Sequence, residues 1–203
     1  DKFNIRIKDQ SVTKVTSHKL LGLHIDNCLT WSVHVDKICA KLRSKLFLFR
    51  SIKHLLTLDA RKMYYNSLVQ PIIDYCCSIW GNCAKKELVK IHKMQKQFGR
   101  LILGVKDLRS VSSVNIFKEL DWLPVDERIK YFECVQMYNI MNGHCPPYLS
   151  SHFDNISGIQ TRQTRQTENK ILLLPKFSKH CGQRTFKFRG TKLWNELPSE
   201  LKF

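Results

Sequence analysis

The chain has 203 residues, of which 34 are Lys or Arg and 17 are Asp or Glu, so its formal net charge at pH 7 is +17. With 43% hydrophobic and 10% aromatic residues it can bury a core, which excludes wholesale disorder. No stretch approaches the roughly 18 apolar residues that a bilayer-spanning helix needs. The length fits one domain, or one domain with an appendage.

The positive charge is unevenly spread along the chain. Residues 1–57 carry a net +7, residues 58–104 +5, residues 105–160 −2 and residues 161–203 +7. A basic first half, an acidic island and a basic tail indicate a surface for a polyanion. Nucleic acid is the first candidate and an anionic membrane surface the second. A solvated basic face without a partner is the simpler alternative.

The first residues, Asp1-Lys2-Phe3-Asn4, include neither an initiator methionine nor a secretion signal. We therefore expect a piece of a longer reading frame. The eight cysteines, several of them at apolar helical positions, are expected to be reduced. The predicted location is intracellular, in the nucleus and/or the cytoplasm, and the chain is not expected to be secreted.

The first 29 residues have the alternating pattern of β-strands. Three strands are predicted, the first with Phe3, Ile5 and Ile7 on one side, the second over Val12–Val15 and the third over Lys19–Ile25, with Gly22 at a bend. So few strands need a larger sheet or helices to cover them.

From residue 30 to residue 104 the apolar period becomes helical. Thr30 is the predicted N-cap of a first helix whose apolar row is Trp31, Val35, Ile38, Leu42, Leu46 and Phe49. A second helix is predicted to begin at Thr57 and to run through Met63 and Leu68 to Pro71. Pro71 is expected to kink or restart this helix before the segment Asp74–Trp80.

A third helix is predicted from about Ala84 to Leu103, with Gly104 as its C-terminal stop. Its apolar row is Leu88, Ile91, Phe98 and Ile102, with Gln95 in the gap.

Residues 105–153 are predicted to add a short helix and a long one. The short helix carries Ile116, Phe117 and Leu120, and the long one begins at Pro124 and ends near Asn142-Gly143. Residues 154–170 are expected to form an exposed basic linker. After it, Ile171–Leu174 and Phe186/Phe188 have strand-like patterns, and a closing helix is predicted around Leu193-Trp194. The predicted fold class is therefore mainly α with a small N-terminal antiparallel β-hairpin or sheet (α+β).

Cationic side chains on two predicted helices are the candidate binding residues. The first helix carries Lys37, Lys41 and Lys45 at intervals of four, and the third carries Lys86, Lys90, Lys93 and Arg100 nearly opposite its apolar row. Like charges at this spacing repel each other, so two uncompensated rows favour contact with phosphates. Ordinary solvated lysine faces are the alternative for either helix taken alone.

A further cationic candidate lies near the C-terminus. Arg184, Lys187 and Arg189 alternate with Phe186 and Phe188, a pattern suited to stacking on nucleic-acid bases. A half-buried strand explains the same alternation.

Candidate catalytic and metal-binding residues are sparse. No Asp-Asp pair occurs, although two-metal phosphoryl chemistry needs converging carboxylates. His24 and Asp26 could share a metal on one strand face. Zinc ligands could be drawn from His144-Cys145, His152 and His180-Cys181, but the Cys-x-x-Cys spacing typical of zinc sites is missing. We therefore expect no catalytic residue, metal site or cofactor in this chain.

Short motifs follow one another in a fixed order along the chain. They are Leu20-Leu21-Gly22, His24-Ile25-Asp26, Leu29-Thr30-Trp31, Tyr64-Tyr65-Asn66-Ser67-Leu68, Pro71, Asp74-Tyr75-Cys76, Trp80-Gly81, Leu120-Asp121-Trp122-Leu123-Pro124, Arg128, Asn142-Gly143, Pro146-Pro147-Tyr148-Leu149, Thr161-Arg162 and Leu193-Trp194-Asn195-Glu196-Leu197-Pro198. In this order they resemble the C-terminal part of the reverse transcriptases of non-LTR (LINE-type, jockey-like) retrotransposons, over nearly the whole chain. One departure is Leu20, where that family usually carries an aromatic residue.

This resemblance implies a division of the chain into the end of the palm (1–29), a helical thumb-like bundle (30–104), a helical C-terminal region (105–153) and a basic linker and tail (154–203). The thumb would bind the duplex of RNA template and DNA primer through the cations named above, by phosphate contacts that position without reading sequence. In that family the fingers, the rest of the palm and the aspartates that bind Mg²⁺ lie upstream. This chain alone is therefore predicted to be inactive as a polymerase.

Two other functions remain compatible with the residues. One is a stand-alone basic helical module that binds nucleic acid or protein without enzyme activity. A protein partner would then use the acidic island, where Ile129, Phe132 and Val135 form an apolar stripe. The other is a metal-dependent nuclease that uses His24, Asp26 and the C-terminal His/Cys pairs.

Overall fold

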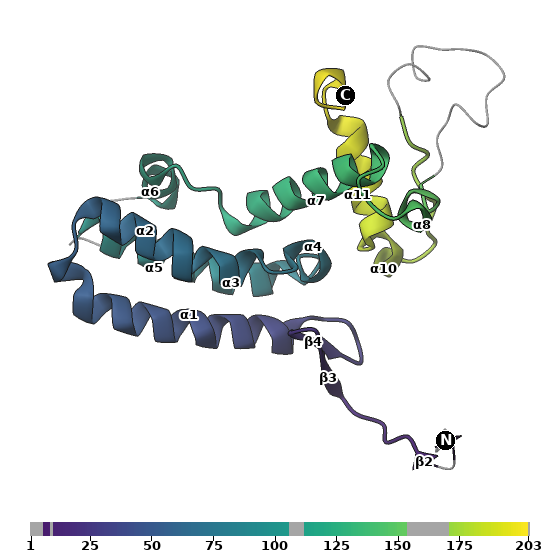
Figure 1. Cartoon of the computed structure of the whole chain (residues 1–203), viewed down its shortest axis with the longest axis horizontal. Coiled ribbons are helices and arrows are strands. Elements are labelled where there is room, and N and C mark those ends of the chain that lie inside the picture. Colours follow the sequence, from purple (N-terminus) through teal and green to yellow (C-terminus); the bar gives the residue numbers. More distant parts are fainter. Residues whose placement is uncertain (1–5, 9, 106–111, 154–170, 203) are drawn as a thin grey trace.

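Helices dominate the computed structural model, which describes residues 6–8, 10–105, 112–153 and 171–202. Two small two-stranded antiparallel sheets precede the helices, so the predicted fold class, mainly α with a small N-terminal β region, is confirmed. Figure 1 shows the strands at one end of the first long helix and the C-terminal helices to the right of the bundle.

The N-terminal strands are shorter than predicted and form two separate antiparallel pairs. β1 (Arg6–Ile7) pairs with β2 (Gln10–Ser11), and β3 (Ser17–Leu20) pairs with β4 (Leu23–Asp26). The single strand predicted over Lys19–Ile25 is wrong, because Leu21 and Gly22 both adopt positive φ, at 46° and 85°, and form a hairpin turn. The strand predicted over Val12–Val15 is also wrong, and Phe3 and Ile5 lie outside the described residues.

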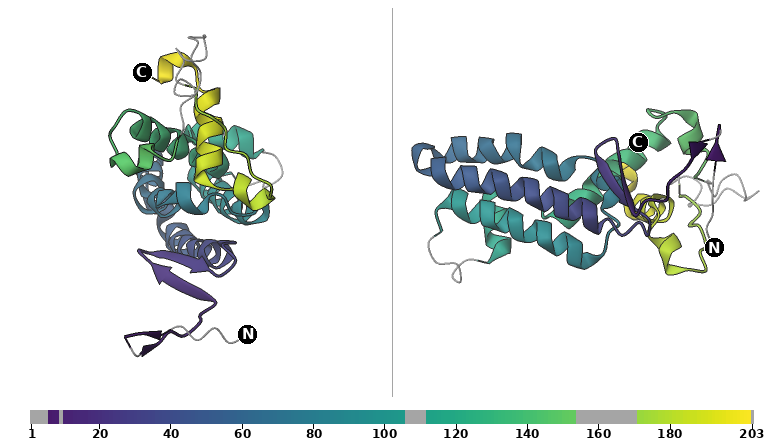
Figure 2. Two further views of the ribbon diagram at one scale, coloured as in Figure 1. Left: turned by 90° about the vertical axis from the view of Figure 1, so that its right-hand side faces the viewer. Right: turned by 90° about the horizontal axis from the view of Figure 1, so that it is seen from below.

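Three longer helices form the bundle that follows. α1 (Ser32–Ile52) packs against α5 (Lys85–Leu103), and α2 (Leu58–Leu68) lies beside α5 as well. A short 3-10 turn, η1 (Lys53–Leu55), links α1 to α2. The apolar row predicted for α1 is buried, and so are Ile91, Phe98, Ile102 and the interposed Gln95 on α5. Figure 2 shows α1 facing the viewer when the bundle is seen from below.

The helix ends follow the local sequence in most places. The Thr57 side chain accepts a hydrogen bond from the Ala60 N–H and caps α2, and Gly104 closes α5 in the left-handed conformation, both as predicted. On α2 the buried side chain is Tyr65, while Met63 and Leu68 are 67% and 41% exposed.

Two short helices replace the segment expected after Pro71. α3 (Gln70–Asp74) has Pro71 in its first turn and ends before Tyr75, and α4 (Cys77–Trp80) begins after Cys76. Cys76 has a φ of 51°, so the chain bends sharply between the two helices. The continuous segment Asp74–Trp80 that the sequence indicated is therefore interrupted.

The next two helices lie where they were predicted. α6 (Ser113–Leu120) buries Ile116, Phe117 and Leu120 against α5, and α7 (Val125–Met141) begins directly after Pro124. The Gln95 Oε1 atom accepts a hydrogen bond of 3.0 Å from the Val125 N–H, which ties the start of α7 to α5.

The C-terminal segment forms a second, smaller core with α7. It comprises α8 (Pro147–Ser150), α10 (His180–Gln183), α11 (Phe186–Glu196) and the 3-10 turn η3 (Ser199–Leu201). The buried centre consists of Met137, Leu172 and Trp194. The linker predicted over residues 154–170, with its Thr161-Arg162 motif, lies outside the described residues.

The strand predicted at Phe186/Phe188 is wrong, since both residues are in α11, which Thr185 caps through a bond from the Phe188 N–H. Ile171–Leu174 forms no strand beyond the single bridge residue Leu172. The Asn195 side-chain amide bonds both the N–H and the carbonyl of Leu172 at 2.9 Å.

Candidate nucleic-acid interface

The outer face of α1 presents cations to solvent. Lys37 and Lys41 are exposed and Lys45 is half-buried, on the helix whose opposite face is in the core. Arg43 and Arg50, which the sequence analysis did not single out, are exposed on the same helix. Among these side chains Phe47 is 78% exposed. The exposed side of α1 therefore combines cations with apolar side chains that lie outside the core, which are Phe47, Leu48 and Val33.

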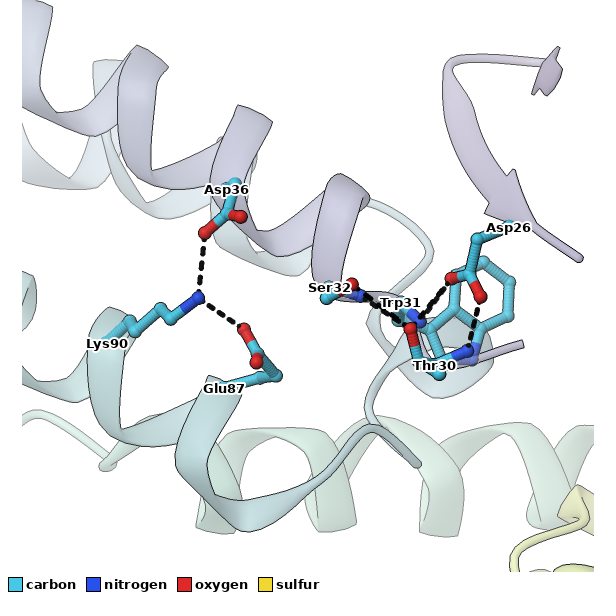
Figure 3. A network of polar contacts seen from close by, with 7 residues as sticks. All are labelled: Asp26, Thr30, Trp31, Ser32, Asp36, Glu87 and Lys90. Carbon is cyan, nitrogen blue, oxygen red and sulfur yellow. Dashed lines mark hydrogen bonds and ion pairs between the residues drawn. The ribbon is translucent and has the colours of Figure 1, made fainter. Parts of the chain in front are cut away.

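On α5 the predicted cationic row is partly compensated. Lys86 and Lys93 are exposed, but the Lys90 Nζ atom lies 2.8 Å from the Asp36 Oδ1 atom and 2.7 Å from the Glu87 Oε2 atom (Figure 3). The hydrogen bonds to Asp36 and then to Glu87 raise the pKa of Lys90. The expectation of two uncompensated rows is thus wrong for Lys90. The Glu87-Lys90 spacing of three could have revealed one of its partners.

The same ion pair joins the α5 row to the flank of α1 that carries Arg43, because Asp36 is two turns before Arg43 and about 100–180° around the helix from Lys37, Lys41 and Lys45. Asp36 belongs to α1 and Lys90 to α5, so the bond brings the α5 row next to the start of α1. Arg100, at the other end of α5, is half-buried and takes part in contacts within the protein. The surface that offers cations to a ligand therefore centres on α1, with Lys86 and Lys93 beside it.

A buried carboxylate fixes the start of α1. The Asp26 side chain accepts hydrogen bonds from the Trp31 N–H at 2.8 Å, from the Thr30 N–H at 3.0 Å and from the Cys28 N–H and Thr30 hydroxyl at 3.1 Å (Figure 3). Burial opposes ionisation, but these bonds outweigh it and lower the pKa of Asp26. The residue that precedes the helix is Trp31, in the left-handed conformation, so the prediction of Thr30 as N-cap is wrong.

Beside this carboxylate, the buried His34 joins the hairpin to the bundle. Its Nδ1 atom accepts a 3.3 Å hydrogen bond from the His24 N–H, and its ring lies against Trp31 and Trp80. Burial, with the nearby charges of His24 and Lys41, lowers the pKa of His34 to about 4. His24 and Asp26 thus lie in a hydrogen-bonded joint between β4 and α1.

The three C-terminal cations are in α11 or directly before it. Arg184 donates to the Asn82 carbonyl at 3.0 Å, and Arg189 forms a 2.6 Å ion pair with the buried Glu133 of α7. Lys187 is half-buried and also has contacts within the protein. These contacts hold α11 against the bundle, so the two guanidinium groups are already engaged by protein atoms. Sequence reasoning missed them because it assigned this stretch to a strand.

Within the described ranges, no three His, Cys, Asp or Glu side chains gather as ligands of a metal ion. His144 is exposed and Cys145 half-buried after α7, and nothing is described of the His180 side chain. In the same ranges, no helix has the length and apolar character needed to cross a membrane.

Comparison with known proteins gives one informative similarity. The chain is 30% identical, over 103 residues, to a protein described as a probable RNA-directed DNA polymerase from transposon X-element of Drosophila melanogaster. The match covers 49% of this chain and 11% of that much longer protein. No family model matches the chain, and no solved structure does. The similarity supports a relation to retrotransposon reverse transcriptases, as the ordered motifs indicate.

Proposed function

We propose that this chain is the end of the palm, the thumb and the C-terminal extension of an RNA-directed DNA polymerase of a non-LTR retrotransposon. It would bind the duplex of RNA template and DNA primer inside the cell, in the nucleus and/or the cytoplasm. The similarity to the transposon polymerase and the order of the motifs support this assignment. The Mg²⁺-binding aspartates, the fingers and the remaining palm are assigned to other parts of the same polypeptide.

The exposed cationic face of α1 is the observation that carries the binding proposal. It presents Lys37, Lys41 and the half-buried Lys45 on one flank of the helix, and the exposed Arg43 and Arg50 on the other flank. A straight helix with cations along its outer side can follow a phosphate backbone without reading bases. Lys86 and Lys93 of α5 add cations next to the Arg43 flank, and Lys90 contributes through its ion pair with Asp36, which holds the two helices together.

Fluorescence anisotropy with a labelled RNA–DNA duplex, measured over a series of salt concentrations, tests the proposal. The triple substitution Lys37→Gln, Lys41→Gln and Lys45→Gln removes three candidate phosphate contacts from one helix. We expect weaker binding and a log K against log salt slope that is flatter by about one unit for each lost contact.

The matched control removes the same charge from other elements. Lys118, Lys130 and Lys192 lie exposed on α6, α7 and α11, and their triple replacement by Gln also lowers the net charge by three. The control should retain a slope within about half a unit of the parent chain. Equal slopes in the two triple variants would reject α1 as the binding face and leave only a general effect of net charge.

A further inference from the structure

The connection between β4 and α1, residues 27–31, contains two residues in a disfavoured backbone conformation. Leu29 has a φ of 51° and Trp31 a φ of 64°, both in the left-handed region that residues with a Cβ rarely adopt. Residues persist in this region only where the surrounding structure holds them there. The contacts of the 27–31 connection therefore decide how α1 begins.

Two distant parts of the chain hold the 27–31 connection. From the hairpin, the Asp26 carboxylate accepts the N–H groups of Cys28, Thr30 and Trp31. From the C-terminal segment, the Arg184 Nη2 atom donates to the Leu29 carbonyl at 3.4 Å, across 155 positions of sequence. The hairpin thus engages N–H groups of the connection, and Arg184 engages a carbonyl.

Arg184 is itself fixed by a reciprocal pair of hydrogen bonds with Asn82, which lies between α4 and α5. The Arg184 Nε atom donates to the Asn82 carbonyl at 3.0 Å, and the Asn82 Nδ2 atom donates to the Arg184 carbonyl at 3.2 Å. A charged donor strengthens such bonds. Figures 1 and 2 show α10 and α11 at the end of the bundle from which the β3–β4 hairpin extends. Arg184, in the turn between α10 and α11, therefore links this turn to the start of α1.

The packing between the start of α1 and α11 is incomplete. A hollow of about 520 Å³ lies there, and Trp31, Asn82, Thr185 and Phe186 are among the residues that line it. Trp31 is 5% exposed, and its indole N–H has no hydrogen-bond partner among the described residues. Since a hollow forfeits van der Waals contacts, the bonds of Arg184 carry much of the contact between α11 and the start of α1.

We propose that Arg184 is a positioning residue, which holds the 27–31 connection and thereby keeps the first turns of α1, with Lys37, in the place where they meet the duplex. This inference rests on the proposed function, because it concerns the same cationic helix. It gives the C-terminal segment a role at the binding face without a phosphate contact of its own. A direct phosphate contact by Arg184, as predicted from the sequence, is the alternative that the experiments separate from it.

Amide hydrogen exchange, followed by NMR without nucleic acid, tests whether Arg184 holds the connection. In Arg184→Gln the N–H groups that Asp26 accepts should exchange about tenfold faster or more, because the connection opens more often. Arg184→Lys keeps one donor group without the planar fork and should give an intermediate rate. Lys192→Gln removes the same charge from an exposed position on α11 and should change these rates by less than about twofold.

The exchange of the Ile91 and Phe98 amides, within α5, reports whether each variant keeps its fold. These rates should stay within about twofold of the parent chain. If Arg184→Gln does not fold, Arg184→Lys decides the outcome. Rates at the connection that stay within about twofold in the folded variants would overturn the proposal, and so would an equal acceleration in Lys192→Gln.

A double-mutant cycle on duplex affinity separates positioning from direct contact. Arg184→Gln and Lys37→Gln together should weaken binding by about threefold less than the product of their separate effects, because both act on the same contact. Lys45→Gln, two turns further along α1, is the matched control and should combine with Arg184→Gln to within about twofold of the product.

The outcomes of the cycle are distinct. Effects that multiply for both lysines would make Arg184 a separate phosphate contact and overturn the proposal. A parent chain that binds no duplex would reject the proposed function, whereas the exchange rates, measured without nucleic acid, would still decide whether Arg184 holds the connection.

Discussion

Protonation of His34 is expected to loosen the joint between the hairpin and α1. Its pKa, lowered to about 4, lies below the ordinary value of 6.5 because burial and the charges of His24 and Lys41 disfavour the cation. The neutral ring accepts the His24 N–H at Nδ1, and protonation of that atom removes the acceptor. Since the folded-state pKa is the lower one, the stabilisation is complete above about pH 6.5 and is lost as the pH falls toward 4.

The expected magnitude follows from these two values. At about pH 5 the unfolded chain carries the His34 proton almost fully while the folded chain carries little of it, which corresponds to about 2 kcal/mol of lost stability relative to pH 7.5. Glu133 acts in the opposite direction, because burial, only partly offset by the Arg189 charge, raises its pKa to about 7. The contribution of Glu133 to the stability of the fold is present at low pH and is lost as the pH rises through about 7.

A variant that does not titrate separates the two groups. His34→Asn can keep an acceptor for the His24 N–H but has no proton to gain. The free energy of unfolding of each protein is measured by urea unfolding followed by tryptophan fluorescence. Between pH 7.5 and pH 5, the difference in this free energy between the parent chain and His34→Asn should shift by about 2 kcal/mol in favour of the variant. A difference that stays constant within about 0.5 kcal/mol would refute the assignment of the acid sensitivity to His34.

Three further substitutions test the packing around the candidate site. Asp26→Ala removes the carboxylate that accepts the Thr30 and Trp31 N–H groups and should lower the free energy of unfolding by about 2–3 kcal/mol, whereas Asp26→Asn should recover part of this loss. Urea unfolding measures both variants, and a loss below about 0.5 kcal/mol for Asp26→Ala would contradict the role of the cap. Gly99→Ala brings a Cβ into the Ile116 side chain and should cost about 1–3 kcal/mol by thermal unfolding, so an unchanged melting temperature would show that α6 moves freely away from α5. Arg128→Lys loses the two-point bond to Asp74 and should cost about 1–2 kcal/mol in the same assay; full retention of stability would mean that this pair contributes nothing to holding α7.

Much of the bundle could be predicted from periodicity and capping residues. The apolar rows of α1 and α5 and the stop at Gly104 depend on interactions within one helix, so local sequence is sufficient for them. The strand predicted at Phe186 and Phe188 is wrong because alternation over so few residues also fits a helix, and Thr185 is the local signal that was missed.

The candidate site was only partly predictable for a related reason. The row at Lys37 and Lys41 follows from spacing on one helix, whereas the bond between Lys90 and Asp36 joins residues 54 apart in the sequence. The pairing of Arg189 with the buried Glu133 likewise depends on how α11 packs on α7. Which cations remain available to a ligand is therefore decided by tertiary packing.

The contact between α1 and a duplex is tested most directly by site-specific photo-crosslinking. A photoreactive amino acid at Ser44, exposed on α1, should form a crosslink to a labelled RNA–DNA duplex. The same group at Val114, 71% exposed on α6, should form almost none. A crosslink at Val114 without one at Ser44 would contradict the assignment of α1 as the nucleic-acid-binding face.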